Sequence, residues 1–244
     1  MKFDRAVEYY DRTRALPDDI SARQRDIVMA ELRGATRVLE VGVGTGRIAT
    51  TLDAPIVGLD LSRPMMEVLR TKTSAIPLVE GDATCLPFDD GAFDAAYAAH
   101  VLHLIPTWED AMAEMVRVVR PGGVLLAVRG SGANDVERAM NADLGLRERS
   151  VGAHTIEDID AGARRLGLSV RELERITWTR PLSLAEVAAN VERGIWSGMW
   201  ARTADELRAE AVRVRHWAAE RYGSPDAVVD ATASFAWHAY DVPS

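Results

Sequence analysis

The stretch VLEVGVGTG, residues 38–46, decides the fold of this chain of 244 residues. A short apolar run that carries one acidic residue, Glu40, leads into three glycines at alternate positions. Glycine permits positive φ and lets the backbone approach a ligand closely. We expect a helix to begin near Arg47, with its free N–H groups facing an electronegative group of that ligand. The stretch therefore predicts a buried strand, a ligand-binding turn and a helix.

Apolar runs alternate with helix-like segments on both sides of that turn, between residues 37 and 129. Strands are expected at residues 37–41, 55–59, 76–79, 93–99 and 124–128, and helices at residues 62–71 and 107–119. Such alternation implies parallel strands in an open α/β sheet. The carboxyl ends of these strands then meet at one edge, where open α/β sheets bind their ligands.

The flanking sequence is more helical. Helices are expected at residues 20–32, 155–166 and throughout 183–222, and strands at residues 168–178 and 227–240. No linker-like composition separates a second domain. We therefore expect one domain over residues 1–244, with residues 183–222 inserted as a helical cap between two late strands. Trp196 and Trp200 have the i, i+4 spacing of neighbours on a helix, and are candidates for core packing or for an apolar lid.

Composition and charge exclude several classes of protein. A hydrophobic content of 48% with 27% charged residues is that of a globular chain. The net charge of −8 gives no overall attraction for nucleic acid or an anionic membrane. A single cysteine, Cys85, excludes an internal disulfide and a zinc–cysteine site. Because no signal-peptide core and no membrane-spanning apolar run is found, we expect a soluble cytoplasmic protein. We expect no metal, because no His/Asp/Glu cluster has the spacing of metal ligands. The sequence does not indicate an oligomeric state.

Two more features follow expected strands. Asp60 ends the second strand, and an acidic side chain there can accept both hydroxyls of a ribose. Gly81-Asp82-Ala83 follows the third strand, so that Asp82 can accept from an adenine amino group while the N–H of Ala83 donates to a ring nitrogen. Each feature alone is also typical of a turn or a helix cap. Together with the glycine turn they predict a nucleoside site at the carboxyl edge of the sheet.

Four segments occur in the order found in class I S-adenosylmethionine-dependent methyltransferases: VLEVGVGTGRIA (38–49), VGLDLSRPMMEVLR (57–70), EGDATCLPFDDGAFDAAYAAHVLHLI (80–105) and VVRPGGVLLAV (118–128). The chain resembles most the small-molecule branch that includes ubiquinone- and menaquinone-biosynthesis enzymes. The resemblance implies a Rossmann-like α/β fold, with a seven-stranded, mostly parallel sheet whose last strand is antiparallel. It also implies S-adenosyl-L-methionine as cofactor, S-adenosyl-L-homocysteine as product and a small organic acceptor.

The resemblance further implies roles for individual residues. Glu40 would orient the glycine turn and the methionine amino group, and Asp60 would bind the ribose hydroxyls. The N-terminal segment, residues 1–36, would fold over the cofactor through Tyr9-Tyr10-Asp11-x-x-Arg14, with Tyr10 closing the methionine end. The remaining expected cofactor contacts are Gly42, Val43, Gly44 and Gly46 in the turn, Leu61, Met65, Gly81, Asp82 and Ala83 around the adenine, and Ala98 and Ala99 on the methionine side.

Methyl transfer from a sulfonium mainly requires that the protein position the nucleophile and exclude water. A general base is needed only when the acceptor is protonated at the working pH, and His100 is the candidate.

A dinucleotide-dependent oxidoreductase is disfavoured by the G-x-G-x-G spacing. A non-catalytic protein that binds S-adenosylmethionine or S-adenosylhomocysteine stays open. An RNA or protein methyltransferase is disfavoured because no basic–aromatic tract is present. The sequence indicates neither the acceptor nor its reacting atom.

Overall fold

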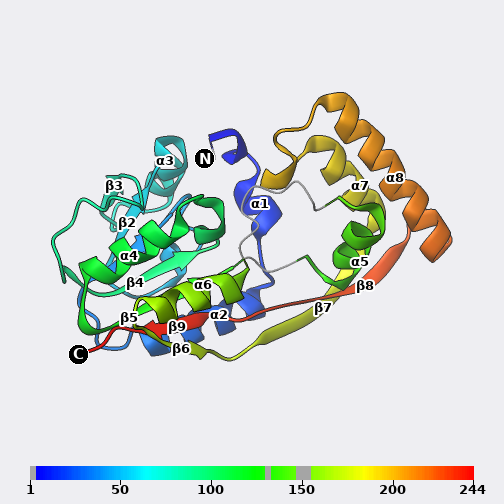
Figure 1. Ribbon diagram of the computed structural model, residues 1–244. Coiled ribbons are helices and arrows are strands. Elements are labelled where there is room, and N and C mark those ends of the chain that lie inside the picture. Colours follow the sequence, from blue (N-terminus) through cyan, green and yellow to red (C-terminus); the bar gives the residue numbers. More distant parts are fainter. Residues whose placement is uncertain (1–3, 130–132, 147–154) are drawn as a thin grey trace. The chain divides into compact units, whose positions relative to one another are not determined.

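The computed structural model describes residues 4–129, 133–146 and 155–244, and its chain forms two compact units (Figure 1). Unit 1 comprises residues 1–130, 154–176 and 235–244, and unit 2 comprises residues 131–153 and 177–234. The first three residues of the predicted N-terminal segment lie outside the described residues. The predicted cap, residues 183–222, belongs to unit 2.

Unit 1 contains a seven-stranded sheet in the order β3-β2-β1-β4-β5-β9-β6. The strands are β1 (Val38–Val41), β2 (Ile56–Asp60), β3 (Leu78–Glu80), β4 (Phe93–Ala99), β5 (Val119–Val128), β6 (Ser169–Glu172) and β9 (His238–Asp241). Strands β1 to β5 pair in parallel, whereas β9 is antiparallel to both β5 and β6. The predicted Rossmann-like sheet with a reversed last strand is therefore confirmed.

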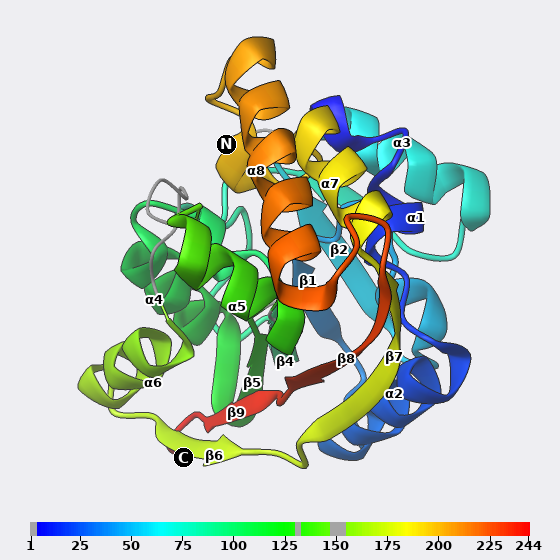
Figure 2. The same cartoon turned by 90° about the vertical axis from the view of Figure 1, so that its right-hand side faces the viewer.

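Helices cover both faces of this sheet, with α4 and α6 on one face and α2 on the other (Figures 1 and 2). The helical elements of unit 1 are η1 (Asp4–Ala6), α1 (Tyr10–Arg14), α2 (Asp18–Glu31), η2 (Ala49–Thr51), α3 (Arg63–Lys72), η3 (Leu102–Leu104), α4 (Trp108–Val118) and α6 (Ile156–Arg165). As predicted, α3 begins at a serine cap followed by a proline, since the Ser62 hydroxyl accepts from the N–H of Met65.

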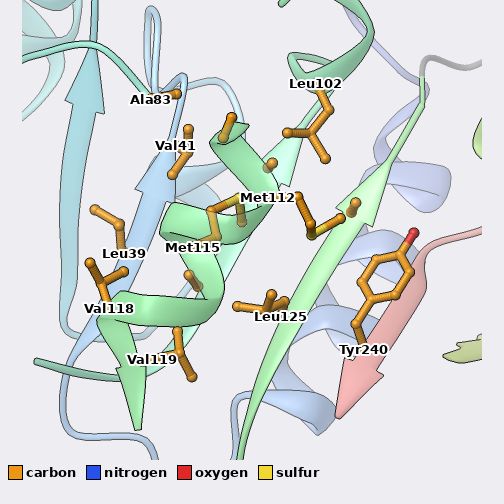
Figure 3. Close-up of a cluster of buried hydrophobic side chains, with 14 of the residues drawn as sticks. Leu39, Val41, Ala83, Leu102, Met112, Met115, Val118, Val119, Leu125 and Tyr240 are labelled. Carbon is orange, nitrogen blue, oxygen red and sulfur yellow. The ribbon is translucent and has the colours of Figure 1, made fainter. Parts of the chain in front are cut away.

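The main core lies between the sheet and α4 (Figure 3). Met112 and Met115 point from one face of α4 onto the strands, where they meet Leu39 and Leu125. Because both faces of the sheet are covered, its central strands are apolar along nearly their whole length. All four residues of β1 are buried, so Glu40 is held inside an otherwise apolar strand.

The segment that follows the glycine turn differs from the prediction. A helix was expected to begin near Arg47, but within residues 47–55 the chain forms only the short 3₁₀ turn η2 before it enters β2. A helix that returns along a five-residue strand needs about eleven residues, because a helix rises only 1.5 Å per residue. Residues 47–55 are too few for this. The expected helix is therefore wrong, and with it the expected helix N-terminus beside the ligand.

Unit 2 has a helical core and a two-stranded ribbon of its own. Its elements are α5 (Asp135–Leu144), α7 (Leu184–Arg193), η4 (Ser197–Met199) and α8 (Ala204–Tyr222), with β7 (Ile176–Ser183) pairing to β8 (Val228–Phe235). Helices α7 and α8 pack together around Val187, Val191 and Val214. Trp196 and Trp200 flank η4, so their helical spacing does not place them on one continuous α-helix.

The expected strands at residues 168–178 and 227–240 each prove to be two strands. The first gives β6 and the start of β7, and the second gives β8 and β9. In both segments the chain leaves one sheet and joins another after two or three unpaired residues. Local alternation of apolar and polar residues predicts β structure but not the partner strand. The sequence therefore predicts one strand where the structure has β6 and β7, and one where it has β8 and β9.

Candidate functional site

The glycine turn is built at the carboxyl end of β1. Gly42, Gly44 and Gly46 all have positive φ. A Cβ on Gly42 would lie 2.6 Å from a methyl group of Val101, so no side chain fits there. A Cβ on Gly44 would make only ordinary contacts, 3.6 Å from Met65 Cε and 3.9 Å from Asp60 Oδ2. Gly44 is half-buried, and its nearest side chains are Met65 and Asp60, two of the predicted ligand-binding residues.

Val43 packs its side chain toward β2. It is 3% exposed, and a Cβ on Gly58 of β2 would lie 2.9 Å from both of its methyl groups. Its N–H donates to the carbonyl of Leu59 at 3.0 Å. The Val43 side chain therefore packs between the turn and β2, and does not line the ligand side.

Asp60 connects the glycine turn to the start of α3. Its Oδ2 accepts from the N–H of Gly44 at 2.8 Å, and its Oδ1 accepts from the N–H of Ser62 at 2.7 Å. Burial raises the pKa of Asp60, and the backbone hydrogen bonds oppose that rise. Each carboxylate oxygen has a further lone pair. The structure thus brings Asp60 and the turn together, as the sequence predicted.

Glu40 is the most deeply buried acidic group of the site, with 2% of its surface exposed. The hydroxyl of Tyr97 on β4 donates to its Oε2 at 2.7 Å. Burial raises the pKa of Glu40 to about 8, while the Tyr97 hydrogen bond and the charge of Arg47 act to lower it. Sequence analysis missed Tyr97. The available signal was its place in β4, because parallel pairing puts Tyr97 directly beside Glu40.

The N-terminal segment is attached to the glycine turn through Asp11. Thr45 Oγ1 donates to Asp11 Oδ1 at 2.5 Å, and Lys72 Nζ donates to Asp11 Oδ2 at 2.6 Å and to the Thr45 carbonyl at 2.8 Å. Burial would raise the pKa of Asp11, but the hydrogen bonds from Lys72 and Thr45 outweigh it and lower the pKa. A second attachment joins Ser62 Oγ to Asp4 Oδ1 at 2.6 Å. Sequence analysis quoted Asp11 within its motif but assigned no contact to it or to Lys72.

Tyr10 lies among the charged groups of the site. Burial raises its pKa, the charges of Arg47 and Arg14 act to lower it, and those of Asp60 and Glu40 act to raise it. Tyr10 is therefore within electrostatic range of Arg47, Asp60 and Glu40. The segment is attached to the glycine turn through Asp11 and Thr45, whereas its place over a cofactor and the role of Tyr10 stay predictions.

His100 follows Ala98 and Ala99 at the carboxyl end of β4. Its φ of 59° lies in the left-handed region, and its N–H donates to the carbonyl of Val128 at 2.8 Å. Burial, followed by the charges of Arg47 and other cationic neighbours, lowers the pKa of His100 well below its ordinary value. Its Nδ1 is buried without a hydrogen-bond partner in the described part of the chain. The imidazole is therefore neutral at neutral pH and has an unsatisfied nitrogen.

The predicted adenine side is more open. Leu61 is 37% exposed, and Asp82 is exposed at the end of β3. The N–H and hydroxyl of Thr84 both donate to Asp82 Oδ1, at 2.9 and 2.8 Å, which lowers the Asp82 pKa. Ala83 is buried beside it, and the N–H of Gly81 donates to the carbonyl of Asp60 at 3.0 Å. The second oxygen of Asp82 remains available to a ligand.

A cavity of about 170 Å³ lies beside the glycine turn, between α2 and the residues that precede β2. Its lining consists of Asp11, Ala15, Leu16, Ser21, Gln24, Arg47 and Thr51. Two lining atoms, Gln24 Oε1 and Arg47 Nε, are buried without a hydrogen-bond partner in the described ranges. Buried polar atoms are normally satisfied. This region is therefore incomplete without a polar ligand or water.

Two negative findings concern the described residues only. Within residues 4–129, 133–146 and 155–244, no group of three or more His, Cys, Asp or Glu side chains could hold a metal ion. None of the helices in the same ranges combines the length and apolarity needed to cross a membrane.

Comparisons with known proteins agree with this geometry. A family model described as a methyltransferase domain matches residues 39–127. A demethylmenaquinone methyltransferase of Thermus thermophilus is 35% identical over 119 residues, which cover 45% of this chain and 54% of that protein. A phthiotriol/phenolphthiotriol dimycocerosates methyltransferase of Mycobacterium ulcerans is 33% identical over 156 residues, covering 59% and 57%. The chain thus spans little more than half the length of these curated relatives.

Solved structures share the fold. The crystal structure of the YcgJ protein from Bacillus subtilis matches with a TM-score of 0.64 and 19% identity, and the match covers 93% of this chain and all of that one. At this identity the likeness concerns the fold alone. The strand order, the positions of Glu40 within β1 and Asp60 at the end of β2, and the family match over residues 39–127 agree with one another. Residues 39–127 are therefore similar to a methyltransferase domain, and the curated relatives that match this part of the chain are named as methyltransferases.

Proposed function

We propose that the chain transfers a methyl group from S-adenosylmethionine to a small organic acceptor. One observation carries the proposal: the Asp60 carboxylate accepts a hydrogen bond from the N–H of Gly44, in the half-buried glycine turn at the carboxyl end of β1. A ribose placed there would meet a carboxylate that is already fixed in position. The family match and the relatives' names support the same reaction class.

The residues present fit the cofactor. Its methionine end carries an ammonium and a carboxylate, and the site offers a buried carboxylate in Glu40 and unsatisfied polar atoms on Arg47 and His100. Its ribose hydroxyls fit Asp60, and its adenine fits the exposed Leu61 with the free oxygen of Asp82. Gly42, Gly46 and Met65 shape the turn, while Gly81, Ala83, Ala98 and Ala99 contribute the surrounding backbone.

When bound, S-adenosylmethionine supplies a methyl group that is already activated by its sulfonium. The chain then has to position the acceptor and exclude water. His100 holds a neutral imidazole at the carboxyl end of β4, and we assign it as the general base where the acceptor carries a proton. Its lowered pKa makes it a weak base, suited to an acceptor that is itself fairly acidic.

Residues 183–222 supply a helical cap in this proposal, within a single domain over residues 1–244. The protein is proposed to act in the cytoplasm, without nucleic acid. A non-catalytic binding protein would have the same cofactor site but would form no methylated product. The test must therefore measure both binding and turnover.

Calorimetric titration of the purified protein with S-adenosylmethionine tests the first half, with NAD and NADP as controls. We expect saturable binding of S-adenosylmethionine alone. Absence of binding by folded, ligand-free protein would overturn the proposal. An acceptor screen read by mass spectrometry then tests for a methylated product. Binding without any methylated product would favour the non-catalytic alternative.

His100→Ala is expected to lower turnover while leaving cofactor affinity nearly unchanged. The matched control is His103→Ala, which removes a histidine from the adjacent turn η3. If both variants turn over at the wild-type rate, His100 is not the base.

A further inference from the structure

The hydrogen bond that Glu40 Oε2 accepts points to a function for Tyr97, a residue outside the predicted motifs. Glu40 and Tyr97 are direct partners in the parallel pairing of β1 with β4. The Tyr97 hydroxyl donates to Glu40 Oε2 at 2.7 Å, and Tyr97 is fully buried. Strand register thus fixes the hydroxyl at one oxygen of the carboxylate.

The Tyr97 ring is held in turn by the last strand segment. Trp237, which directly precedes β9, is fully buried and meets the Tyr97 ring edge-on, with centroids 6.2 Å apart and an angle of 67°. Edge-to-face packing of this kind favours one ring orientation. The chain Trp237–Tyr97–Glu40 therefore leaves the tyrosine hydroxyl little freedom to turn away from the carboxylate.

A carboxylate in this position needs such a partner. Oxygen atoms of a buried carboxylate that find no donor cost several kcal/mol, as a rough guide. Among the described groups that act electrostatically on Glu40, only Tyr97 donates a hydrogen bond, while Arg47 acts through its charge and Asp60 opposes ionisation. Tyr10 of α1 also lies within range of the Glu40 charge. Tyr97 thus decides how easily the ionised form is reached.

We propose that Tyr97 is a positioning residue: its hydroxyl holds Oε2 of Glu40, so that the other oxygen is directed to the cationic amino group of the cofactor. The second half of this inference rests on the proposed function, because only a cationic ligand benefits from an ionised, oriented Glu40. The first half, the effect of Tyr97 on Glu40 itself, is independent of any ligand.

The ligand-free experiment follows the protonated carboxyl band of Glu40 by infrared spectroscopy as pH is raised. Glu40→Gln, which lacks the band, assigns it. In wild-type protein the band is expected to disappear around the pKa of about 8 that burial gives Glu40. In Tyr97→Phe, which keeps the ring, the midpoint is expected to move upward by about one pH unit, the shift that corresponds to loss of one hydrogen bond to a charged group.

The matched control is Tyr240→Phe. Tyr240 is equally buried, and its hydroxyl also donates to a carboxylate, Asp160, but on another part of the sheet. This variant loses a comparable buried hydrogen bond and should leave the Glu40 midpoint unchanged. A Tyr97→Phe variant whose midpoint equals that of wild type would overturn the inference.

The ligand experiment measures S-adenosylmethionine affinity at pH 7. Tyr97→Phe is expected to bind about tenfold more weakly, whereas Tyr240→Phe binds like wild type. In the Glu40→Gln background, Tyr97→Phe should have no further effect on affinity. If wild-type protein does not bind S-adenosylmethionine, the proposed function fails while the infrared result still stands. If wild type binds and Tyr97→Phe binds equally well, the positioning role fails.

Discussion

Asp160 and Glu40 of unit 1 are buried carboxylates that each accept a hydrogen bond from a tyrosine, but they differ in their other hydrogen-bond partners. Asp160 of α6 accepts from the Tyr240 hydroxyl at 3.0 Å and has His238 Nδ1 at 3.0 and 3.1 Å from its two oxygens. Among the described residues, Tyr97 is the one hydrogen-bond donor to Glu40, which lies beside the glycine turn. Asp160 is therefore satisfied by the fold itself, whereas Glu40 keeps unused hydrogen-bonding capacity.

This difference separates a stabilising group from a functional one. A carboxylate whose oxygens all have partners adds to stability and gains nothing from a ligand. A buried carboxylate with a free oxygen costs stability and regains it only when a cation binds. The comparison thus predicts opposite consequences for substituting the two groups.

The largest effect is expected for Asp160→Ala. The substitution leaves the buried His238 and Tyr240 without their partner, so the free energy of unfolding should fall by about 3–5 kcal/mol. Urea denaturation measures the loss, and calorimetry on the folded fraction should find unchanged affinity for S-adenosylmethionine. A variant of normal stability, or one with a specific loss of affinity, would erase the distinction between the two carboxylates.

Glu40→Gln should have the reverse effect on stability, and the effect should depend on pH. Because the folded-state pKa is raised to about 8, protonated Glu40 stabilises the fold fully below its ordinary pKa, and this contribution is lost as pH rises through 8. Glutamine cannot ionise, so the variant should gain roughly 2–4 kcal/mol over wild type between pH 5 and pH 9. Thermal or urea unfolding across that range tests it. If the free energies of unfolding of the two proteins depend on pH in the same way, burial does not raise the pKa of Glu40.

Asp60→Ala sharpens the comparison with a third carboxylate. Asp60 is fixed by two backbone N–H groups, one of them that of Gly44 in the glycine turn, so it should resemble Glu40 in function. Loss of its charge-assisted hydrogen bonds should weaken S-adenosylmethionine binding by about 1.5–3 kcal/mol. Asp94→Ala, which removes a carboxylate at the start of β4, is the control and should not change the dissociation constant. An unchanged dissociation constant for Asp60→Ala would remove this residue from the site.

The smallest effect is expected for Asp11→Ala. Its partner Lys72 is about one-third exposed, so the ion pair adds little, and the affinity for S-adenosylmethionine should fall by about 0.5–1 kcal/mol. Raising the salt concentration should reduce the difference from wild type, since exposed pairs are screened. Asp26→Ala, which removes an exposed pair on α2, is the control. A loss as large as that of Asp60→Ala would mean that Asp11 contacts the ligand itself.

Much of unit 1 could be predicted from the sequence. Strands β1 to β4 fall within two residues of the expected ranges, because each is a local apolar run bounded by turn residues. The glycine turn, Glu40 within β1 and Asp60 at the end of β2 could be predicted for the same reason. The helix expected after Gly46 was inferred from the glycine motif alone. It was wrong because the residues between Gly46 and β2 are too few for a helix that returns along the sheet.

The remaining misses depend on contacts between distant parts of the sequence. Nothing local distinguishes β8 from β9, since only their partners place them in different sheets. Tyr97 reads as one aromatic residue in an alanine-rich strand until its pairing with Glu40 is known. Asp11 and Lys72 are 61 residues apart in the sequence, and their hydrogen bond exists only in the folded chain.

The reversed direction of β9 determines where a fused partner would lie. His238 pairs with Ala127 near the carboxyl edge of the sheet, and Asp241 pairs with Val124, three residues earlier in β5. The chain then continues away from the carboxyl edge, and the N–H of Val242 donates to the carbonyl of Gly123. A fluorescent protein or surface anchor attached after Ser244 would emerge far from the glycine turn, whereas one attached ahead of Asp4 would adjoin the segment that Ser62 holds. Labelling at the carboxyl terminus therefore leaves the glycine turn accessible.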